Sequence, residues 1–91
     1  MKLSQEQRKE GDEKIKAITS VMRDIEKKLD KELFSTPYIS DNGKNAYASF
    51  HGNGMLFYDI PYEIFMALPQ KQLVIEIMRA LTIEFNDYEN E

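Results

Sequence analysis

His51 is the only histidine of the chain, and Ser49 lies two residues before it. A serine beside a histidine is the starting point of a hydrolytic site, because the imidazole takes the proton of the hydroxyl. Such a site also needs a carboxylate that orients the ring, and no motif places an acidic residue for this role. We therefore interpret His51 as a histidine at the rim of a turn and predict no catalytic residue.

The segment 41–45, Asp-Asn-Gly-Lys-Asn, is rich in oxygen atoms of the kind that bind calcium. It lacks the alternating ligands and the terminal bidentate glutamate of a calcium loop, so we interpret it as a turn. The chain has no cysteine, which excludes disulfides, thiol catalysis and cysteine-ligated zinc. The sequence thus predicts no metal and no cofactor, and it predicts a protein that is not an enzyme.

Three short β-strands are predicted between Pro37 and Ile60, because two glycine turns separate runs of β-prone residues. The Asn42-Gly43 dipeptide favours a two-residue type I′ turn. This turn pairs Asp41 with Lys44, and the pairs that follow are Ile39–Ala46 and Tyr38–Tyr47. Alternation assigns one set of residues to the core: Ile39, Ala46, Ala48 and Phe50. It assigns a second set to the opposite face: Tyr38, Tyr47, Ser49 and His51.

The second turn, Gly52-Asn53-Gly54, leaves the register of the third strand open. A two-residue turn places Met55 and Phe57 on the core face. The same turn places Leu56 and Tyr58 on the opposite face, and a three-residue loop reverses both assignments. Both sets are apolar, so the sequence favours neither register. We predict a protein interface on the face away from the first helix, with these candidate residues: Tyr38, Tyr47, Ser49, His51, Leu56 and Tyr58.

Helical patterns flank the three strands. Apolar residues recur at steps of three and four and predict one continuous helix over residues 12–34. Ser4 and Gln7 have the spacing of a capping box, but Gly11 weakens a helix near residues 10–12. We therefore predict that residues 1–11 are a polar N-terminal extension that contributes little stability. Residues 12–91 are predicted to form a single α+β domain.

Two prolines organise the C-terminal part of the chain. Pro61 predicts a short helix over residues 62–67, and Pro69 predicts a longer one from residue 70 to about Phe85. The acidic residues from Glu84 to the end are predicted to fray. The predicted fold class is therefore α+β, with a long N-terminal helix, a three-stranded antiparallel β-meander, and one short and one longer C-terminal helix (α-β-β-β-α-α).

The net charge of −4 is unevenly spread along the chain. Residues 1–34 hold nine basic and eight acidic residues, whereas residues 35–91 hold three basic and eight acidic ones. Nucleic-acid binders concentrate basic residues, because neutralising phosphates dominates their affinity. The sequence therefore disfavours a nucleic-acid partner. It also lacks an apolar run of about 20 residues that would span a membrane, and we expect a cytoplasmic protein.

The order of helix, three strands and helix resembles the YbaB/EbfC group of bacterial nucleoid-associated proteins. The glycine turn 52–54 and Asp59-Ile60-Pro61 after the third strand add to the likeness, which runs from about Ile15 to Phe85. The resemblance implies a dimer that binds DNA. Pro69, the extra short helix and the acidic C-terminal half depart from the family pattern, so no DNA-contact residue is carried over.

The combined patterns favour a small non-enzymatic protein–protein interaction module that self-associates, with a homodimer or another protein as partner. Small size and acidity are typical of phage or mobile-element accessory factors and inhibitors that bind a host protein. An acidic helical end is also typical of DNA mimics. The alternative prediction is a YbaB/EbfC-like dimeric DNA-binding protein. No small-molecule substrate is indicated.

Overall fold

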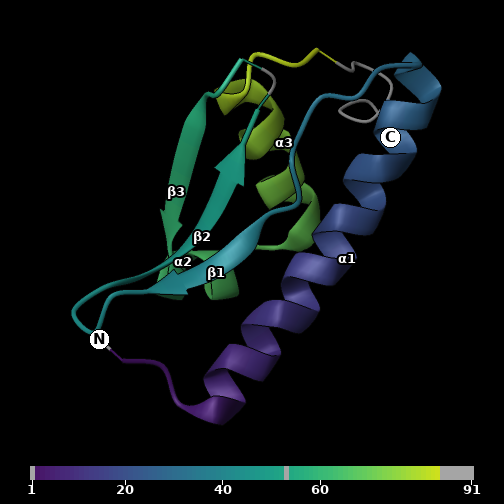
Figure 1. The fold of residues 1–91 in the computed structure, drawn as a ribbon. Coiled ribbons are helices and arrows are strands. Elements are labelled where there is room, and N and C mark those ends of the chain that lie inside the picture. The colour runs from purple at the N-terminus through teal and green to yellow at the C-terminus, as the bar shows by residue number, and fades with distance from the viewer. Residues whose placement is uncertain (1, 53, 85–91) are drawn as a thin grey trace.

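The computed structural model of the chain describes residues 2–52 and 54–84. The chain folds into a long helix, three strands and two further helices (Figure 1). Their bounds are α1 Gln5–Leu29, β1 Tyr38–Asp41, β2 Ala46–His51, β3 Phe57–Pro61, α2 Tyr62–Ala67 and α3 Gln70–Ala80. The three strands form one antiparallel sheet in the order β1-β2-β3. This arrangement confirms the predicted α-β-β-β-α-α order and the α+β class.

The helices pack on one face of the sheet. A single core joins the apolar side chains of that face to the apolar stripes of α1, α2 and α3. In Figure 1, α2 and α3 lie behind the sheet and α1 runs along its β1 side. Residues at the centre of this core are almost inaccessible, and they include Ile18, Ala48, Phe50, Phe65, Leu73 and Ile77. The fold therefore has two layers, and its helices leave the other face of the sheet open.

The register of the first hairpin differs from the predicted one. Asp41 pairs with Ala46, two positions beyond the predicted partner Lys44, so residues 42–45 form the turn. The three predicted pairs are wrong, and the observed pairs are Tyr38–Ser49, Ile39–Ala48, Ser40–Tyr47 and Asp41–Ala46. A shift by an even number of positions keeps each side chain on its face. The predicted core set is therefore buried: Ile39, Ala46, Ala48 and Phe50.

Side-chain hydrogen bonds explain the wider turn. A type I′ turn needs positive φ at both central residues, and only Gly43 has it here, with a φ of 88°. The Asn42 side-chain oxygen instead accepts the N–H groups of Lys44 and Asn45 at 2.9 and 2.8 Å. Asp41 accepts the N–H of Gly43 at 2.8 Å. Asparagine and aspartate stabilise such loops because their short side chains replace backbone partners.

The second turn adopts the three-residue register. The N–H of Gly52 donates to the carbonyl of Leu56 at 2.8 Å, and His51 pairs with Phe57. Gly54 and Met55 both have positive φ, of 86° and 73°. Of the two alternatives left open by the sequence, this one puts Phe57 on the face away from the helices. The remaining pairs of β2 with β3 are Tyr47–Pro61, Ala48–Ile60, Ser49–Asp59 and Phe50–Tyr58.

Helix α1 begins seven residues before the predicted start at residue 12, at Gln5. Ser4 caps it: its hydroxyl accepts the N–H of Gln7, whose side chain accepts the N–H of Ser4. Gly11 lies inside the helix, where a Cβ would come within 3.0 Å of the Tyr62 ring. Glycine at this position thus permits close packing against α2. Residues 4–11, which were predicted to be part of a polar N-terminal extension, thus form the cap and about two turns of helix α1.

Helix α1 also ends earlier than predicted, at Leu29 instead of residue 34. Asp30 takes the left-handed conformation with a φ of 53°. The Glu26 carboxylate then accepts the N–H groups of Leu33 and Phe34 at 2.7 and 3.3 Å. Arg23 holds the same carboxylate at 2.7 Å and donates to the carbonyl of Phe34 at 2.9 Å. These contacts turn the chain from the helix toward β1.

The short helix α2 spans the predicted residues, and α3 starts at Gln70 as predicted. Helix α3 ends at Ala80, so the prediction that it continues to about Phe85 is corrected. The Lys14 ammonium of α1 donates to the carbonyls of Met66 and Leu68 at 3.2 and 2.7 Å, which closes the end of α2. The predicted fraying concerns residues that, from Phe85 onward, lie outside the described ranges.

Candidate functional site

The face of the sheet away from the helices is the candidate functional surface, and we call it the outer sheet face. Alternation and register define its members from all three strands. They are Tyr38, Ser40, Tyr47, Ser49, His51, Phe57, Asp59 and Pro61. The C-terminal helices pack against the opposite face, so they do not cover these residues.

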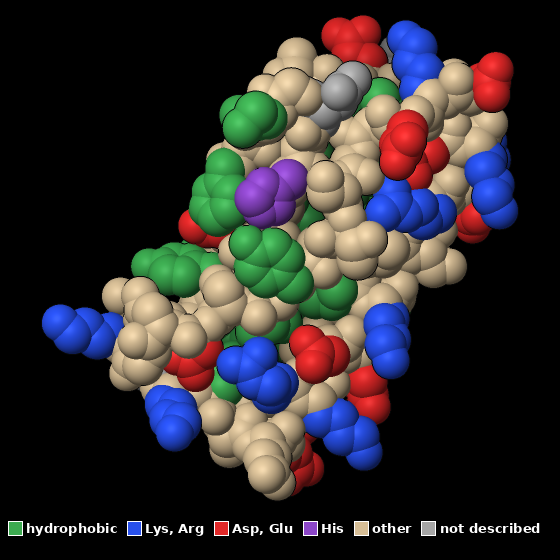
Figure 2. Space-filling view, in the orientation of Figure 1, with side chains coloured by type: hydrophobic (Ala, Val, Ile, Leu, Met, Phe, Trp, Pro, Cys, Tyr) green, Lys and Arg blue, Asp and Glu red, His purple; other side chains and the backbone are tan. Residues whose placement is uncertain are grey.

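Three rings form an aromatic cluster at one end of the outer sheet face. His51 stacks on Tyr38, with ring centroids 5.8 Å apart, and meets Phe57 edge to face at 4.6 Å. The His51 Nε2 lies 3.4 Å from the Tyr38 hydroxyl. Figure 2 shows the single histidine (purple) bordered by hydrophobic side chains (green) on this side of the molecule. The imidazole thus contacts one ring on each of the two neighbouring strands.

A line of polar groups crosses the sheet beside the aromatic cluster. The Ser49 hydroxyl donates to Asp59 at 2.8 Å and lies 3.3 Å from the Ser40 hydroxyl. Ser49 is only 1% exposed. Its proton therefore goes to a carboxylate, and its oxygen is shielded from any substrate by its neighbours. The arrangement provides hydrogen-bond partners for the polar groups at the centre of the face.

Large apolar side chains remain exposed at the aromatic end of the outer sheet face. Phe57 is 50% exposed and Tyr38 is 47% exposed. In the adjoining loop, Met55 is 89% exposed. An apolar region of this kind, concentrated at one end of a sheet, is typical of a contact surface.

The structure brings together four of the six residues predicted for the interface. Tyr38, Tyr47, Ser49 and His51 share the outer sheet face, although Ser49 is buried within it. Leu56 and Tyr58 do not belong to it, because the register turns them toward the helix side of the sheet; Tyr58 packs against the core. Their place beside the cluster is taken by Phe57, which the sequence reasoning did not select. The three-residue alternative for the second turn would have placed Phe57 on this face.

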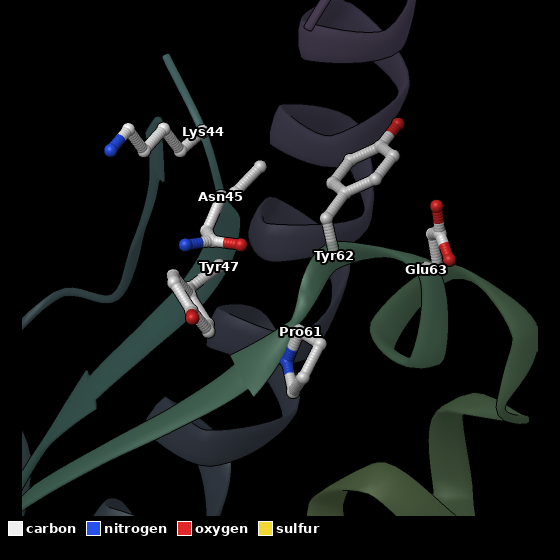
Figure 3. Close-up of a pocket in the computed structure, with 7 residues that line it drawn as sticks. Lys44, Asn45, Tyr47, Pro61, Tyr62 and Glu63 are labelled. Carbon is white, nitrogen blue, oxygen red and sulfur yellow. The ribbon is translucent and has the colours of Figure 1, made fainter. Parts of the chain in front are cut away.

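A shallow hollow of about 250 Å³ adjoins the outer sheet face at its other end. It lies between the first turn and the start of α2, and Asn45, Tyr47, Pro61 and Glu63 are among its lining residues (Figure 3). The Tyr62 side chain points from here toward α1, where its hydroxyl donates to the carbonyl of Gln7 at 2.7 Å. Tyr47 and Pro61 thus belong both to the outer sheet face and to the wall of the hollow.

The titratable groups with shifted pKa values serve the fold. Burial raises the pKa of Glu26, but hydrogen bonds from Arg23, Leu33 and Phe34 outweigh this effect and lower the pKa overall. The N–H groups of Leu3 and Gly43 hold the pKa of Asp41 below its usual value. Both carboxylates therefore stay ionised to hold neighbouring backbone in place.

Within residues 2–52 and 54–84, no three or more side chains of histidine, cysteine, aspartate or glutamate are grouped to hold a metal ion. In the same part of the chain, no helix has the length and apolar character needed to cross a membrane. Comparison of the chain with protein-family models, with curated proteins and with solved structures finds no match.

Proposed function

We propose that the protein is a small interaction module that self-associates through its outer sheet face and acts by binding, not by catalysis. One observation carries the proposal: in the described part of the chain the helices pack on one face of the sheet, while the other face exposes Tyr38 and Phe57 by about half. Burial of such side chains is the main driving force of association, because it removes apolar area from water.

The charge of the outer sheet face supports a second copy of the chain as its partner. Asp59 is its only formally charged residue, and the Ser49 hydroxyl donates to that carboxylate. Two copies can therefore stack these faces without opposing rows of like charge. Two packed sheets lie about 10 Å apart, which is a distance that Tyr and Phe side chains fill.

The outer surface of α1 provides a contrast within the same molecule. Its exposed positions alternate in charge sign, and they include Lys9, Glu10, Asp12, Lys16, Asp24 and Lys27. Such a surface stays hydrated, because desolvating many charges costs more than their pairing returns. The outer sheet face is therefore the surface better suited to a protein contact.

The proposal includes a role as an accessory factor or inhibitor that binds a host protein, of the kind that phages and mobile elements encode. The small size and the net charge of −4 support this role, and an acidic DNA mimic is one form of it. In this role the host protein and the second copy would compete for the outer sheet face.

Light scattering coupled to size-exclusion chromatography tests self-association, with protein loaded at about 1 to 100 µM, the range of a moderate dissociation constant. We expect the mean mass to rise with concentration toward that of a dimer. Tyr47→Lys should keep the mass at the monomer value while circular dichroism shows a folded chain, since no helix covers this position. A wild type that stays monomeric throughout this range contradicts the proposal.

The alternative function is DNA binding by a YbaB/EbfC-like dimer. Its support is the order of the elements, in which a long helix precedes three strands and further helices. The excess of acidic residues after residue 34 favours a protein partner over this alternative.

A further inference from the structure

The two edges of the sheet differ in whether other parts of the chain contact them. At the β1 edge, the N–H of Leu3 donates to the Asp41 carboxylate. The Arg8 guanidinium reaches the carbonyl of Ile39 at 3.5 Å. Helix α1 and the segment before it thus occupy the border of β1. Covering an edge in this way prevents another strand from pairing with it.

The β3 edge presents unpaired backbone groups. Gly52 and Leu56 form a hydrogen-bonded pair. Along an antiparallel ladder, hydrogen-bonded residue pairs alternate with pairs that share no hydrogen bond. Tyr58 and Ile60 are therefore the β3 residues whose backbone groups bond to β2. The N–H and C=O groups of Phe57 and Asp59 therefore point away from β2. Within the described residues, no turn, loop or side-chain hydrogen bond reaches either residue's N–H. Figure 1 shows β3 at the margin of the sheet, with neither a helix nor a strand beyond it.

The side chains along this edge define what could bind there. Phe57 and Asp59 lie on the outer sheet face, two positions apart, so an added antiparallel strand would place two of its own residues directly opposite them. Phe57 belongs to the aromatic cluster and offers an apolar contact. Asp59 is exposed and offers a carboxylate. Residues 52–70 contain two acidic residues, Asp59 and Glu63, and no lysine or arginine.

We propose that the β3 edge binds an extended segment of a partner protein as a fourth, antiparallel strand, with a basic residue opposite Asp59 and an apolar residue opposite Phe57. The backbone groups of Phe57 and Asp59 supply the hydrogen bonds, and the two side chains supply the selectivity. The site shares the Phe57 and Asp59 side chains with the outer sheet face, but its hydrogen bonds use backbone groups at the edge of the sheet, so it does not depend on self-association.

Charge makes a basic segment a better occupant than a second copy of β3. Antiparallel pairing of two β3 strands would set the Asp59 carboxylates of both copies on the same face of adjacent strands, where they repel each other. The short strand and Pro61, which lacks an N–H, also limit unselective pairing. A lysine or arginine opposite Asp59 removes this repulsion and adds an ion pair.

A synthetic peptide tests the proposal on the intact protein. The peptide has about eight residues, the length of an ordinary strand. Threonine occupies every second position, and the positions between are occupied by lysine and valine in turn. N-methylation of the lysines and valines removes the donors that would face β3. N-methylation of the threonines removes only donors that face away, and thus provides a matched control. Binding is followed by ¹⁵N NMR titration and amide hydrogen exchange.

We expect the peptide to slow exchange of the Phe57 and Asp59 amides. Methylation of the lysines and valines should weaken binding at least about tenfold, because several backbone hydrogen bonds are lost, whereas threonine methylation should not. Asp59→Asn, which keeps an acceptor for Ser49, should weaken binding of the lysine peptide but not of a peptide with glutamine in place of lysine.

Four results would overturn the proposal. Equal affinity of the two methylated peptides would show that charge alone attracts the probe. Slower exchange of amides elsewhere than in β3, or no binding of the peptide at low salt, would show that the β3 edge does not bind a strand. If the amides of Phe57 and Asp59 become more protected as protein concentration rises in the absence of peptide, and still do so in Tyr47→Lys, the edge pairs with a second copy of the chain.

Discussion

His51 meets Phe57 edge to face across strands β2 and β3, with ring centroids 4.6 Å apart and an interplanar angle of 75°. The contact follows from the three-residue second turn, which pairs these two residues directly. It joins β3 to the aromatic cluster that begins with Tyr38 on β1. The outer sheet face is therefore apolar across all three strands at this end, and the proposed self-association rests on that continuity.

Because of the register that creates this contact, substitutions at Phe57 and Tyr58 should lower the free energy of unfolding by different amounts. Phe57→Ala should lower the free energy of unfolding by about 1 kcal/mol or less, because Phe57 is half exposed. Tyr58→Ala should cost roughly 2 kcal/mol, because Tyr58 packs against the core. Urea unfolding of the two variants at low protein concentration measures both values. A larger loss for Phe57→Ala would contradict the observed register.

Glu26 predicts a dependence of stability on pH. Its pKa in the folded chain lies below its usual value of 4.5, so the ionised carboxylate stabilises the fold above that pH. This contribution is lost as the pH falls through the folded pKa. Glu26→Gln should cost about 1–3 kcal/mol at pH 7, because it removes the ion pair with Arg23 and weakens the acceptor for two amides.

Chemical denaturation of the wild type and of Glu26→Gln at neutral and at acidic pH measures this effect. The difference between the two proteins should shrink in acid, because the wild-type carboxylate is then protonated. Glu32→Gln, at an exposed position of the following loop, serves as the control and should change little at either pH. A difference that stays constant with pH would contradict the role assigned to Glu26.

The N-terminal residues should be important for stability, in contrast to the prediction from the sequence. Leu3 is 7% exposed and belongs to the core, and Tyr62 donates to the carbonyl of Gln7. Leu3→Ala should lower the free energy of unfolding by about 1–3 kcal/mol, and deletion of residues 2–10 should lower it further. Lys2→Ala, at an exposed position, should have little effect. Thermal melts that are unchanged by the deletion would contradict the packing of this segment.

The fold class followed from the sequence because three strong signals agreed. Apolar residues at steps of three and four marked α1, two glycine turns marked the strands, and Pro61 and Pro69 marked the last helices. The core face of the first hairpin was also predictable. Its register was wrong by two positions, and an even shift leaves the alternation of side chains unchanged.

The details that failed depend on contacts between residues far apart in sequence or on side-chain bonds within loops. Gly11 weakens an isolated helix, but here it packs against Tyr62 on α2, which no local pattern shows. Asn42 bonds two amides of its own turn and displaces the two-residue geometry that its dipeptide favours. The length of the second turn decides on which face of the sheet Phe57 lies. Both faces of β3 are apolar, so the sequence favoured neither turn length.

DNA binding by the alternative, YbaB/EbfC-like function has its own test. Fluorescence anisotropy with random-sequence duplex DNA should show no binding at about 50 mM salt, because the chain carries a net charge of −4. Binding at this salt that weakens steeply as salt is added would support the DNA-binding alternative and contradict our expectation. Titrations with two different duplex sequences show whether any change in anisotropy depends on the DNA sequence.

Self-association through the outer sheet face is the central claim, and two lysine substitutions of equal exposure test it most directly. Phe57 lies on that face and Ile64 lies on α2, and each is 50% exposed. Both Phe57→Lys and Ile64→Lys should leave the monomer folded, as circular dichroism would show.

The deciding measurement is sedimentation equilibrium of the wild type, Phe57→Lys and Ile64→Lys at about 50 µM, where a micromolar dimer is well populated. We predict that the wild type and Ile64→Lys associate to the same extent. Phe57→Lys should remain monomeric, because an unpaired charge buried at an interface is costly. A monomeric wild type, or Phe57→Lys that associates as strongly as Ile64→Lys, would contradict the claim.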